Sequence, residues 1–241
     1  MIKDALEYFA GLANRASDPH IVSLHGLPYS TAQLRPIGRH TAEPLVFSTL
    51  IGLLDYCRRA DGSIRPDGAF LHVASPTRVA LYGPLGEQDR VRECFARAEY
   101  DNANAFHFGA QFEHEAFVIA LSALFAPSED RARLLKLVGN LTAETVSTST
   151  DDGITQTVGQ RMGVALQRRE KIGNPFVLAP LRTFAEIPQV ASPFLFRVHQ
   201  DQSEAPTCAL YECDGGAWRV EAIRRVGSWL SSKLAGVPVL A

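Results

Sequence analysis

The chain has 241 residues, 46% of them hydrophobic, which is enough to bury a substantial core as one large domain or two small ones. Its 24 basic and 26 acidic side chains nearly cancel and leave a formal net charge of -2. This balance excludes a global field that would draw the protein to nucleic acid or to an anionic membrane, although a local basic patch stays open.

The sequence predicts a protein of the cytoplasm that does not enter a membrane. Asp4 and Glu7 interrupt any apolar core of a secretory signal near the start of the chain. The longest apolar segment, residues 44–57, contains Asp55 and falls well short of the roughly 20 apolar residues that a membrane span needs. We therefore interpret this segment as part of a buried helix.

The four cysteines are widely separated and form no Cys-x-x-Cys pair: Cys57, Cys94, Cys208 and Cys213. Their spacing excludes the usual structural zinc sites. A chain of this size without an export signal has little need of disulfides, so we expect free, mostly buried thiols.

The first half of the chain mixes helices and strands. Apolar residues at helical spacing predict helices over residues 2–16, 45–59, 112–125 and 128–139. Ser128 is the expected cap of the last of these helices. Alternating segments predict a small hairpin and then a three-stranded meander, over residues 21–31 and over 70–73, 78–82 and 91–100. A helix is the alternative for residues 91–100, and we favour the strand because a meander would bury the apolar positions of all three segments.

From residue 142 onward the hydrophobic period changes to two. Asp151-Asp152-Gly153 predicts the turn of a hairpin, because the glycine adopts positive φ at low cost. The strands expected in this half cover residues 146–150, 154–158, 163–169, 176–178, 182–187, 193–199 and 207–212. A helix over residues 217–234 is expected to close the chain with one apolar stripe: Ala222, Ile223, Val226, Leu230 and Leu234.

These elements predict the α+β class, with antiparallel sheets, flanking helices, and a β-rich C-terminal half closed by the last helix. Residues 1–140 would form a mixed N-terminal region and residues 141–241 the β-region. A single continuous domain is the alternative, because no linker marks a boundary near Asn140.

No motif predicts catalysis, a cofactor or a metal. Glu113-His114-Glu115 lacks a second ligand four residues away, which a metal-binding helix usually presents. Asp151 and Asp152 lead into a glycine and are better explained as turn residues than as an acid and a base. Glycine-rich phosphate loops are also missing, so we expect no catalytic, cofactor-binding or metal-binding residue and favour a non-enzymatic protein.

Basic residues leave two binding alternatives open. Arg168 and Arg169, with Lys171 and the aromatic Phe176 nearby, are the best candidates for a single-strand binding surface. In a pocket between sheet and helices, Arg97, Arg168 or Arg182 would pair with a phosphate of a small ligand. Trp218 and Trp229 are expected to anchor the last helix by packing.

One set of segments stands out by its order and hydrophobic pattern: residues 5–12, 48–56, 112–117, 151–153, 164–198 and 217–223, with 175–178 and 194–198 as closing strands. In this order and pattern the chain resembles the YfdQ-like family of phage and prophage proteins. The resemblance covers most of the chain and implies a phage-encoded protein of the host cytoplasm. It transfers no active-site residue.

Together these features predict a non-enzymatic phage protein that binds or assembles with copies of itself, as a homo-oligomer. The alternatives are sequestration of a small nucleotide-like ligand and accessory handling of single-stranded DNA. The expected subunit interface is the polar hairpin that is poor in charge: Ser147, Thr148, Ser149, Thr150, Thr155, Gln156 and Thr157.

Overall fold

The computed structural model describes most of the chain, in eleven segments: residues 2–17, 21–24, 27–30, 42–59, 67–86, 90–101, 103–139, 146–151, 156–162, 165–199 and 206–241. Its contacts divide the chain into two units, Met1–Thr41 and Ala42–Ala241.

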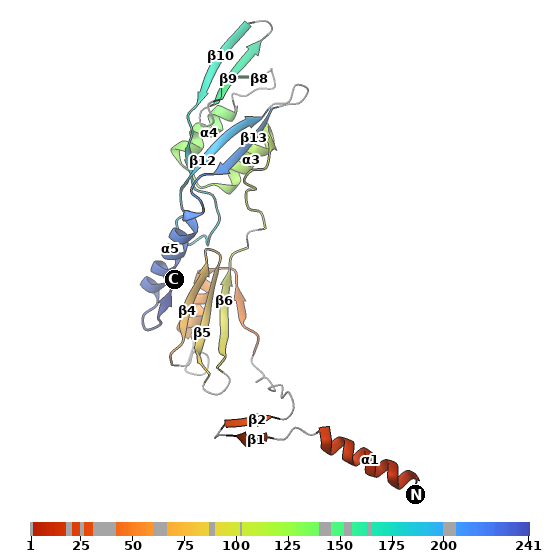
Figure 1. Ribbon diagram of the computed structural model, residues 1–241. Helices are drawn as coiled ribbons and strands as arrows, with labels where there is room; N and C mark the ends of the chain where they lie inside the picture. Colours follow the sequence, from red (N-terminus) through yellow and green to blue (C-terminus); the bar gives the residue numbers. More distant parts are fainter. Residues whose placement is uncertain are drawn as a thin grey trace. The chain divides into compact units, whose positions relative to one another are not determined.

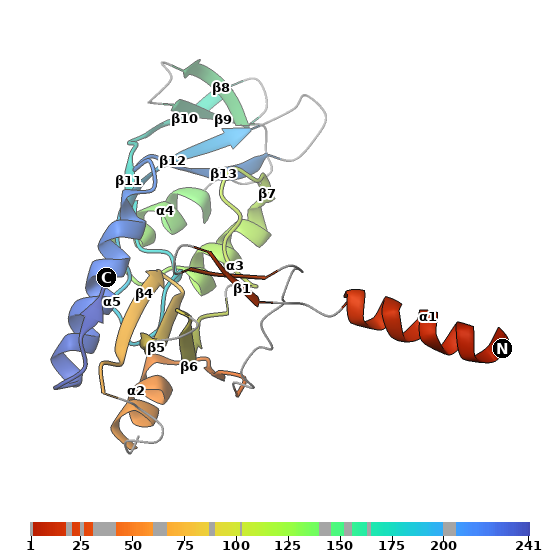
Figure 2. The ribbon, with the colours of Figure 1, turned by 60° about the horizontal axis from the view of Figure 1, so that its bottom comes forward.

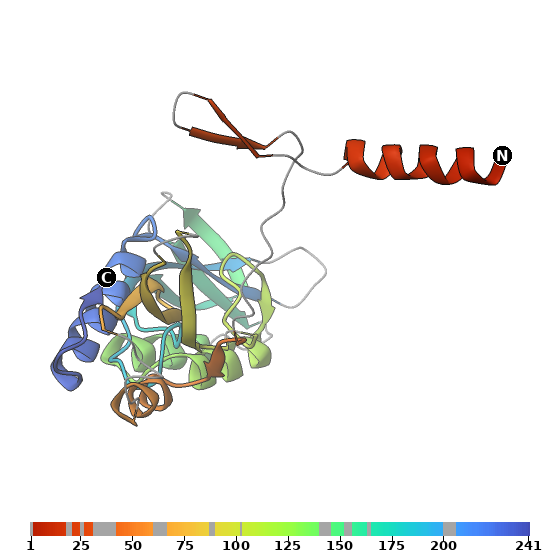
Figure 3. The ribbon, with the colours of Figure 1, turned by 90° about the horizontal axis from the view of Figure 1, so that it is seen from below.

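The described part of the first unit consists of one helix and one hairpin. Helix α1 (Ile2–Ser17) runs without interruption (Figure 3). Strands β1 (Ile21–Leu24) and β2 (Leu27–Ser30) pair antiparallel. Both predicted elements are confirmed, while the turn at residues 25–26 lies outside the described part of the chain.

A five-stranded sheet forms one half of the second unit, in the order β14-β4-β5-β6-β3. The predicted meander is confirmed as β4 (Phe70–Ser75), β5 (Arg78–Leu85) and β6 (Arg92–Glu99). The two edge strands, β3 (Leu45–Phe47) and β14 (Val239–Leu240), pair parallel with β6 and β4 respectively.

Two helices cover one face of this sheet. Helices α2 (Leu50–Arg59) and α5 (Ala217–Lys233) bury their apolar stripes against it, and Figure 1 shows α5 beside β4. The predicted stripe of the C-terminal helix is confirmed, because Ala222, Val226, Leu230 and Leu234 are all buried.

The predicted helix over residues 45–59 is wrong at its start, where the chain forms β3 before α2. Thr49 explains the division. Its side-chain oxygen accepts a hydrogen bond from Gly52 N at 3.1 Å, and its carbonyl accepts one from Leu53 N at 3.4 Å, so Thr49 caps α2. Residues before this cap are free to pair with β6.

Another part of the second unit is a four-stranded antiparallel sheet covered by two helices. Its order is β11-β12-β13-β7, from β11 (Phe176–Leu178), β12 (Ser192–His199), β13 (Thr207–Glu212) and β7 (Phe112–Glu113). Figure 2 shows α3 (His114–Leu124) and α4 (Glu129–Gly139) on the same side of β12 and β13.

This second sheet has its own aromatic core. Phe117 and Phe196, with ring centroids 5.5 Å apart, join α3 to β12. The predicted helix over 112–125 is shorter than expected, since its first two residues pair with β13 as β7. The predicted cap of α4 is confirmed by the hydrogen bond from Arg131 N to Ser128 Oγ at 3.1 Å.

A three-stranded antiparallel sheet completes the described chain: β8 (Val146–Asp151), β9 (Gln156–Met162) and β10 (Ala165–Ile172). Val146 lies opposite Gln160 and Thr148 opposite Val158, which confirms the predicted hairpin. Its turn, with Asp152 and Gly153, lies outside the described residues.

The predicted strand over residues 182–187 is wrong, because this segment is irregular. The side chain of Gln189 makes the backbone hydrogen bonds that a neighbouring strand would otherwise make. Gln189 Oε1 accepts a hydrogen bond from Arg182 N at 3.0 Å. Gln189 Nε2 lies 3.2–3.3 Å from the carbonyl oxygens of Thr183, Phe184 and Ile187. These bonds satisfy backbone groups that would otherwise need a sheet.

The architecture confirms the α+β class, with antiparallel sheets, flanking helices and a closing C-terminal helix. The predicted boundary near Asn140 lies outside the described residues and stays a prediction. Residues from either side of that position share each core, as Phe117 and Phe194 do in one and Leu71 and Leu230 in the other.

Candidate functional site

Arg182 lies in the irregular segment after β11 and is only 5% exposed. Its Nη1 donates a hydrogen bond to Glu212 Oε1 at 2.6 Å, and its Nη2 donates to Ser192 Oγ. The guanidinium carbon lies 3.8 Å from the centroid of the Trp218 ring. A single cation thus joins this segment to β12, to the end of β13 and to the start of α5.

The charge of Arg182 is balanced inside the protein. Burial lowers the pKa of Arg182 to about 10, while the charges of Glu212 and Asp214 oppose that change. Burial alone would raise the pKa of Asp214, but hydrogen bonds from Gly216 N and Trp218 N and the charge of Arg182 outweigh it, so the pKa is lowered. The contacts of Arg182 therefore hold several elements together, and we refer to this residue as a structural staple.

Two of the three arginines that were predicted as alternative phosphate ligands have acidic partners within the protein. Arg182 is committed to Glu212, and Arg97 Nε lies 3.2 Å from Glu99 Oε1. The side chain of Arg168 lies outside the described part of the molecule.

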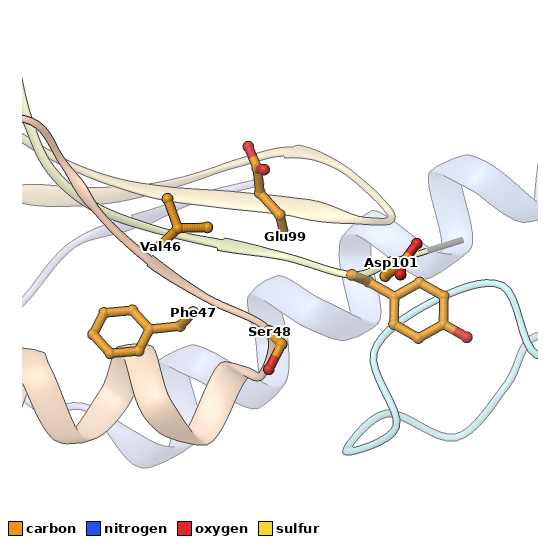
Figure 4. Close-up of a pocket in the computed structure, with 6 residues that line it drawn as sticks. Val46, Phe47, Ser48, Glu99 and Asp101 are labelled. Carbon is orange, nitrogen blue, oxygen red and sulfur yellow. The ribbon is translucent and has the colours of Figure 1, made fainter. Parts of the chain in front are cut away.

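An open pocket lies where the parallel strands β3 and β6 end (Figure 4). Its volume is about 570 Å³, and its lining comes from two three-residue segments: Val46, Phe47 and Ser48, and Glu99, Tyr100 and Asp101. Figure 4 shows Val46 and Glu99 on one side of the strands and Phe47 over α2. The carboxyl ends of parallel strands are a frequent position for ligands in open sheets.

The two carboxylates of this pocket already have partners. Glu99 Oε1 lies 3.2 Å from Nε of both Arg78 and Arg97. Asp101 Oδ1 accepts a hydrogen bond from Ala103 N at 2.9 Å. The pocket is therefore a polar recess in which arginines pair with Glu99 and a backbone N–H binds Asp101.

A second recess of about 540 Å³ follows α5 and is lined by Val220, Ile223, Arg224, Gly227, Ser228, Ser231, Val239 and Ala241. Gly227 allows the last strand to approach the helix, since a Cβ there would meet the side chain of Ala241. Arg224 at its rim is held by Glu221, at 2.6 Å.

Two other candidate residues, His114 and Phe176, make contacts within the protein. His114 Nε2 lies 2.7 Å from the carbonyl oxygen of Val138 and so links α3 to α4. Across the described residues, no three His, Cys, Asp or Glu side chains come together as metal ligands. Phe176 is 2% exposed with the Arg133 guanidinium over its ring at 4.5 Å, so its face is not open to a nucleic-acid base.

The four cysteines differ in burial, and Trp229 contributes to packing. None of the four cysteines forms a disulfide, and Cys57 and Cys208 are buried, Cys94 is half-buried and Cys213 is exposed. Burial raises the pKa of Cys208 to about 12. Trp229 packs against the core between α5 and the sheet.

Helix α1 has a large exposed apolar surface that the sequence did not identify as a site. The exposed fractions are 81% for Ile2, 64% for Leu6, 66% for Phe9 and 41% for Leu12. At about 100° per residue these side chains share one arc of the helix. Lys3 and Glu7, which lie 4.0 Å apart, fall outside that arc. Amphipathic spacing was the available signal, but it does not tell whether the chain covers that face.

No family model, curated protein or solved structure matches this chain. None of the described helices combines the length and apolar character needed to cross a lipid bilayer.

Proposed function

We propose that this is a phage-encoded, non-enzymatic protein of the host cytoplasm that functions by self-assembly. The phage setting is supported by the sequence resemblance. The non-enzymatic role is proposed because no motif in the sequence predicts catalysis. The observation that carries self-assembly is the exposed apolar face of α1, formed by Ile2, Leu6, Phe9 and Leu12. We name these four residues the α1 stripe.

The first unit needs a surface to pack against. Both hydrophobic cores found among the described residues are built from the second unit. Helix α1 has 16 residues, close to the length at which an isolated helix is marginal in water. An isolated two-stranded hairpin such as β1–β2 is marginal too. Exposed apolar side chains on such elements are typical of a protein interaction site.

A second copy of α1 is the partner that fits this stripe. Antiparallel packing of two identical stripes is self-complementary, as a two-fold interface requires. Burying Ile2, Leu6 and Phe9 would contribute about 5 kcal/mol per chain before the entropic cost of association. Two acidic and two basic residues balance each other along α1, so the helix lacks the basic face typical of membrane-surface helices.

Light scattering after size exclusion tests this proposal on the intact chain. The variant Leu6→Gln/Phe9→Gln makes the stripe polar, and Gln preserves helix propensity. The matched control is Lys3→Gln/Glu7→Gln, which changes the same number of residues to the same type away from the stripe and also keeps the net charge.

We expect an oligomeric wild type, an oligomeric control and a monomeric stripe variant. A wild type that is monomeric at all concentrations overturns the proposal and favours packing of α1 within its own chain. Oligomers that survive the stripe variant would direct attention to the predicted interface at the polar hairpin, residues 147–157, whose side chains lie outside the described residues.

A further inference from the structure

The five-stranded sheet has a second face, opposite the helices. Its register places Leu71, Val79, Leu81 and Ala96 on the side buried against α2 and α5. The residues alternating with them lie on the other side: Phe70, His72, Arg78, Tyr82, Arg97 and Glu99. We name this side the open face, because in Figure 1 none of the described helices of the second unit lies in front of β4, β5 and β6.

Aromatic side chains cluster on the open face. The ring centroids of Phe70 and Tyr82 lie 5.9 Å apart, and those of His72 and Tyr82 lie 6.4 Å apart. The Arg92 guanidinium lies over the Phe70 ring, 5.2 Å from its centroid. His72 and Arg92 are exposed and the two larger rings are half-buried, so the rings are fixed by the sheet and still reach the surface.

The same face carries excess positive charge. Among the described residues of this face, Arg78, Arg92 and Arg97 accompany one carboxylate, that of Glu99, which Arg78 and Arg97 share at 3.2 Å each. The Arg78 and Arg97 side chains are 61% and 41% exposed. The formal charge of this cluster is therefore positive, on a chain whose total is -2. An anionic partner would gain from this local field.

We propose that the open face binds single-stranded nucleic acid. Its bases would stack on His72 and Tyr82, beside the Phe70 ring that Arg92 covers, and its phosphates would pair with Arg78 and Arg92. Fixed aromatic rings among arginines on a sheet are the arrangement by which proteins hold single strands without reading sequence. A purely acidic peptide would use the arginines and leave the rings without a stacking partner. This site is separate from the α1 stripe and from the predicted Arg168 cluster.

The test is fluorescence anisotropy with a labelled oligothymidine of about 15 nucleotides, a length within the usual range of single-strand sites. The charge variant is Arg78→Gln/Arg92→Gln, which keeps the contact between Arg97 and Glu99. Its matched control is Arg58→Gln/Arg224→Gln, two exposed arginines that pair with Asp55 and Glu221 elsewhere in the same unit. The stacking variant is Tyr82→Leu, and its control is the exposed Tyr211→Leu.

We expect the wild type and both controls to bind the oligonucleotide, and each face variant to bind about tenfold more weakly. The charge variant should also reduce the slope of log K against log salt by about 0.7 for each phosphate that the protein no longer neutralises. Absence of binding by the wild type at low salt overturns the inference. So does an equal loss in face variants and controls, or polyglutamate competing as well as unlabelled oligothymidine. If a variant does not fold, the slope of log K against log salt for the wild type still tests the inference, because binding through phosphates requires affinity to fall as salt rises.

Discussion

Arg182 shows how one residue connects distant parts of this chain. Its partners Ser192 and Glu212 are 10 and 30 residues away in sequence. The side chain is 6% exposed, whereas that of Glu212 is 28% exposed. Losing the cation would therefore leave a carboxylate that is only partly able to recover water contacts.

The change Arg182→Met should lower the free energy of unfolding by about 2 kcal/mol, less than for a fully buried pair because Glu212 is partly solvated. Urea denaturation followed by circular dichroism measures this loss. The control Arg224→Met removes an arginine that is 71% exposed and should leave the midpoint unchanged. Equal effects from the two changes would contradict the role of Arg182 as a staple.

Asp214 makes stability depend on pH at the start of α5. Its lowered pKa means that the folded state holds the carboxylate more strongly than the unfolded state does, relative to the ordinary value of 3.8. The resulting stability is present above the unfolded pKa and is lost as pH falls through the folded one. Asp214→Asn should cost about 1 kcal/mol at neutral pH, and the difference should shrink below about pH 4. Urea midpoints measured across this range check it, and a constant difference would refute the assignment.

Contacts between residues close in sequence could be predicted, whereas contacts between distant residues could not. Ser128 was identifiable as a cap because its partner Arg131 is three residues away. Arg182 was singled out as a cation, but its sequence neighbours do not reveal Glu212 or Trp218 as its partners. The open face had a usable signal, because Phe70 and His72 on β4, and Ala80 and Tyr82 on β5, recur at every second residue on one side of the sheet. That spacing predicted only the strands and not a binding surface.

At the scale of elements, the segment between β11 and β12 depends on Gln189. Gln189→Glu keeps an acceptor for Arg182 N but removes the amide that donates to three carbonyl oxygens. We expect a loss of about 2 kcal/mol, because carbonyl groups in a partly buried segment would lose their donor. Thermal and urea unfolding measure it.

Gln111→Glu is the control for that change. Gln111 is exposed and accepts a hydrogen bond from Thr207 Oγ1 at 2.9 Å, which a carboxylate also accepts. Stability should therefore be retained in this variant. If Gln189→Glu were equally stable, the amide would not be what holds this segment in place of a strand.

Elements with a local signal were predicted well, and those fixed by distant contacts were not. Alternation and the Asp-Asp-Gly turn were sufficient for the β8–β9 pair. Leu45–Phe47 pairs with β6, about 50 residues further along the chain, and the apolar run that continues into α2 concealed it. The segment after β11 alternates like a strand but is held by a glutamine side chain.

In the intact protein, we propose that α1 forms contacts between copies. The sequence predicted its amphipathic character and the oligomeric role, but it located the interface at the β8–β9 hairpin. The exposed stripe adds a second surface, in a unit that has no part in either described core. Assembly through α1 would also order the small first unit, because burial of the stripe supplies the packing that a short helix lacks.

The most direct test is amide hydrogen exchange of α1 in the intact protein, measured over a series of protein concentrations. Contacts between copies predict slow exchange at high concentration that becomes faster on dilution, and fast exchange at every concentration in Leu6→Gln/Phe9→Gln. Protection of α1 that does not change with concentration would contradict the account, because it would mean that the helix packs within a single chain.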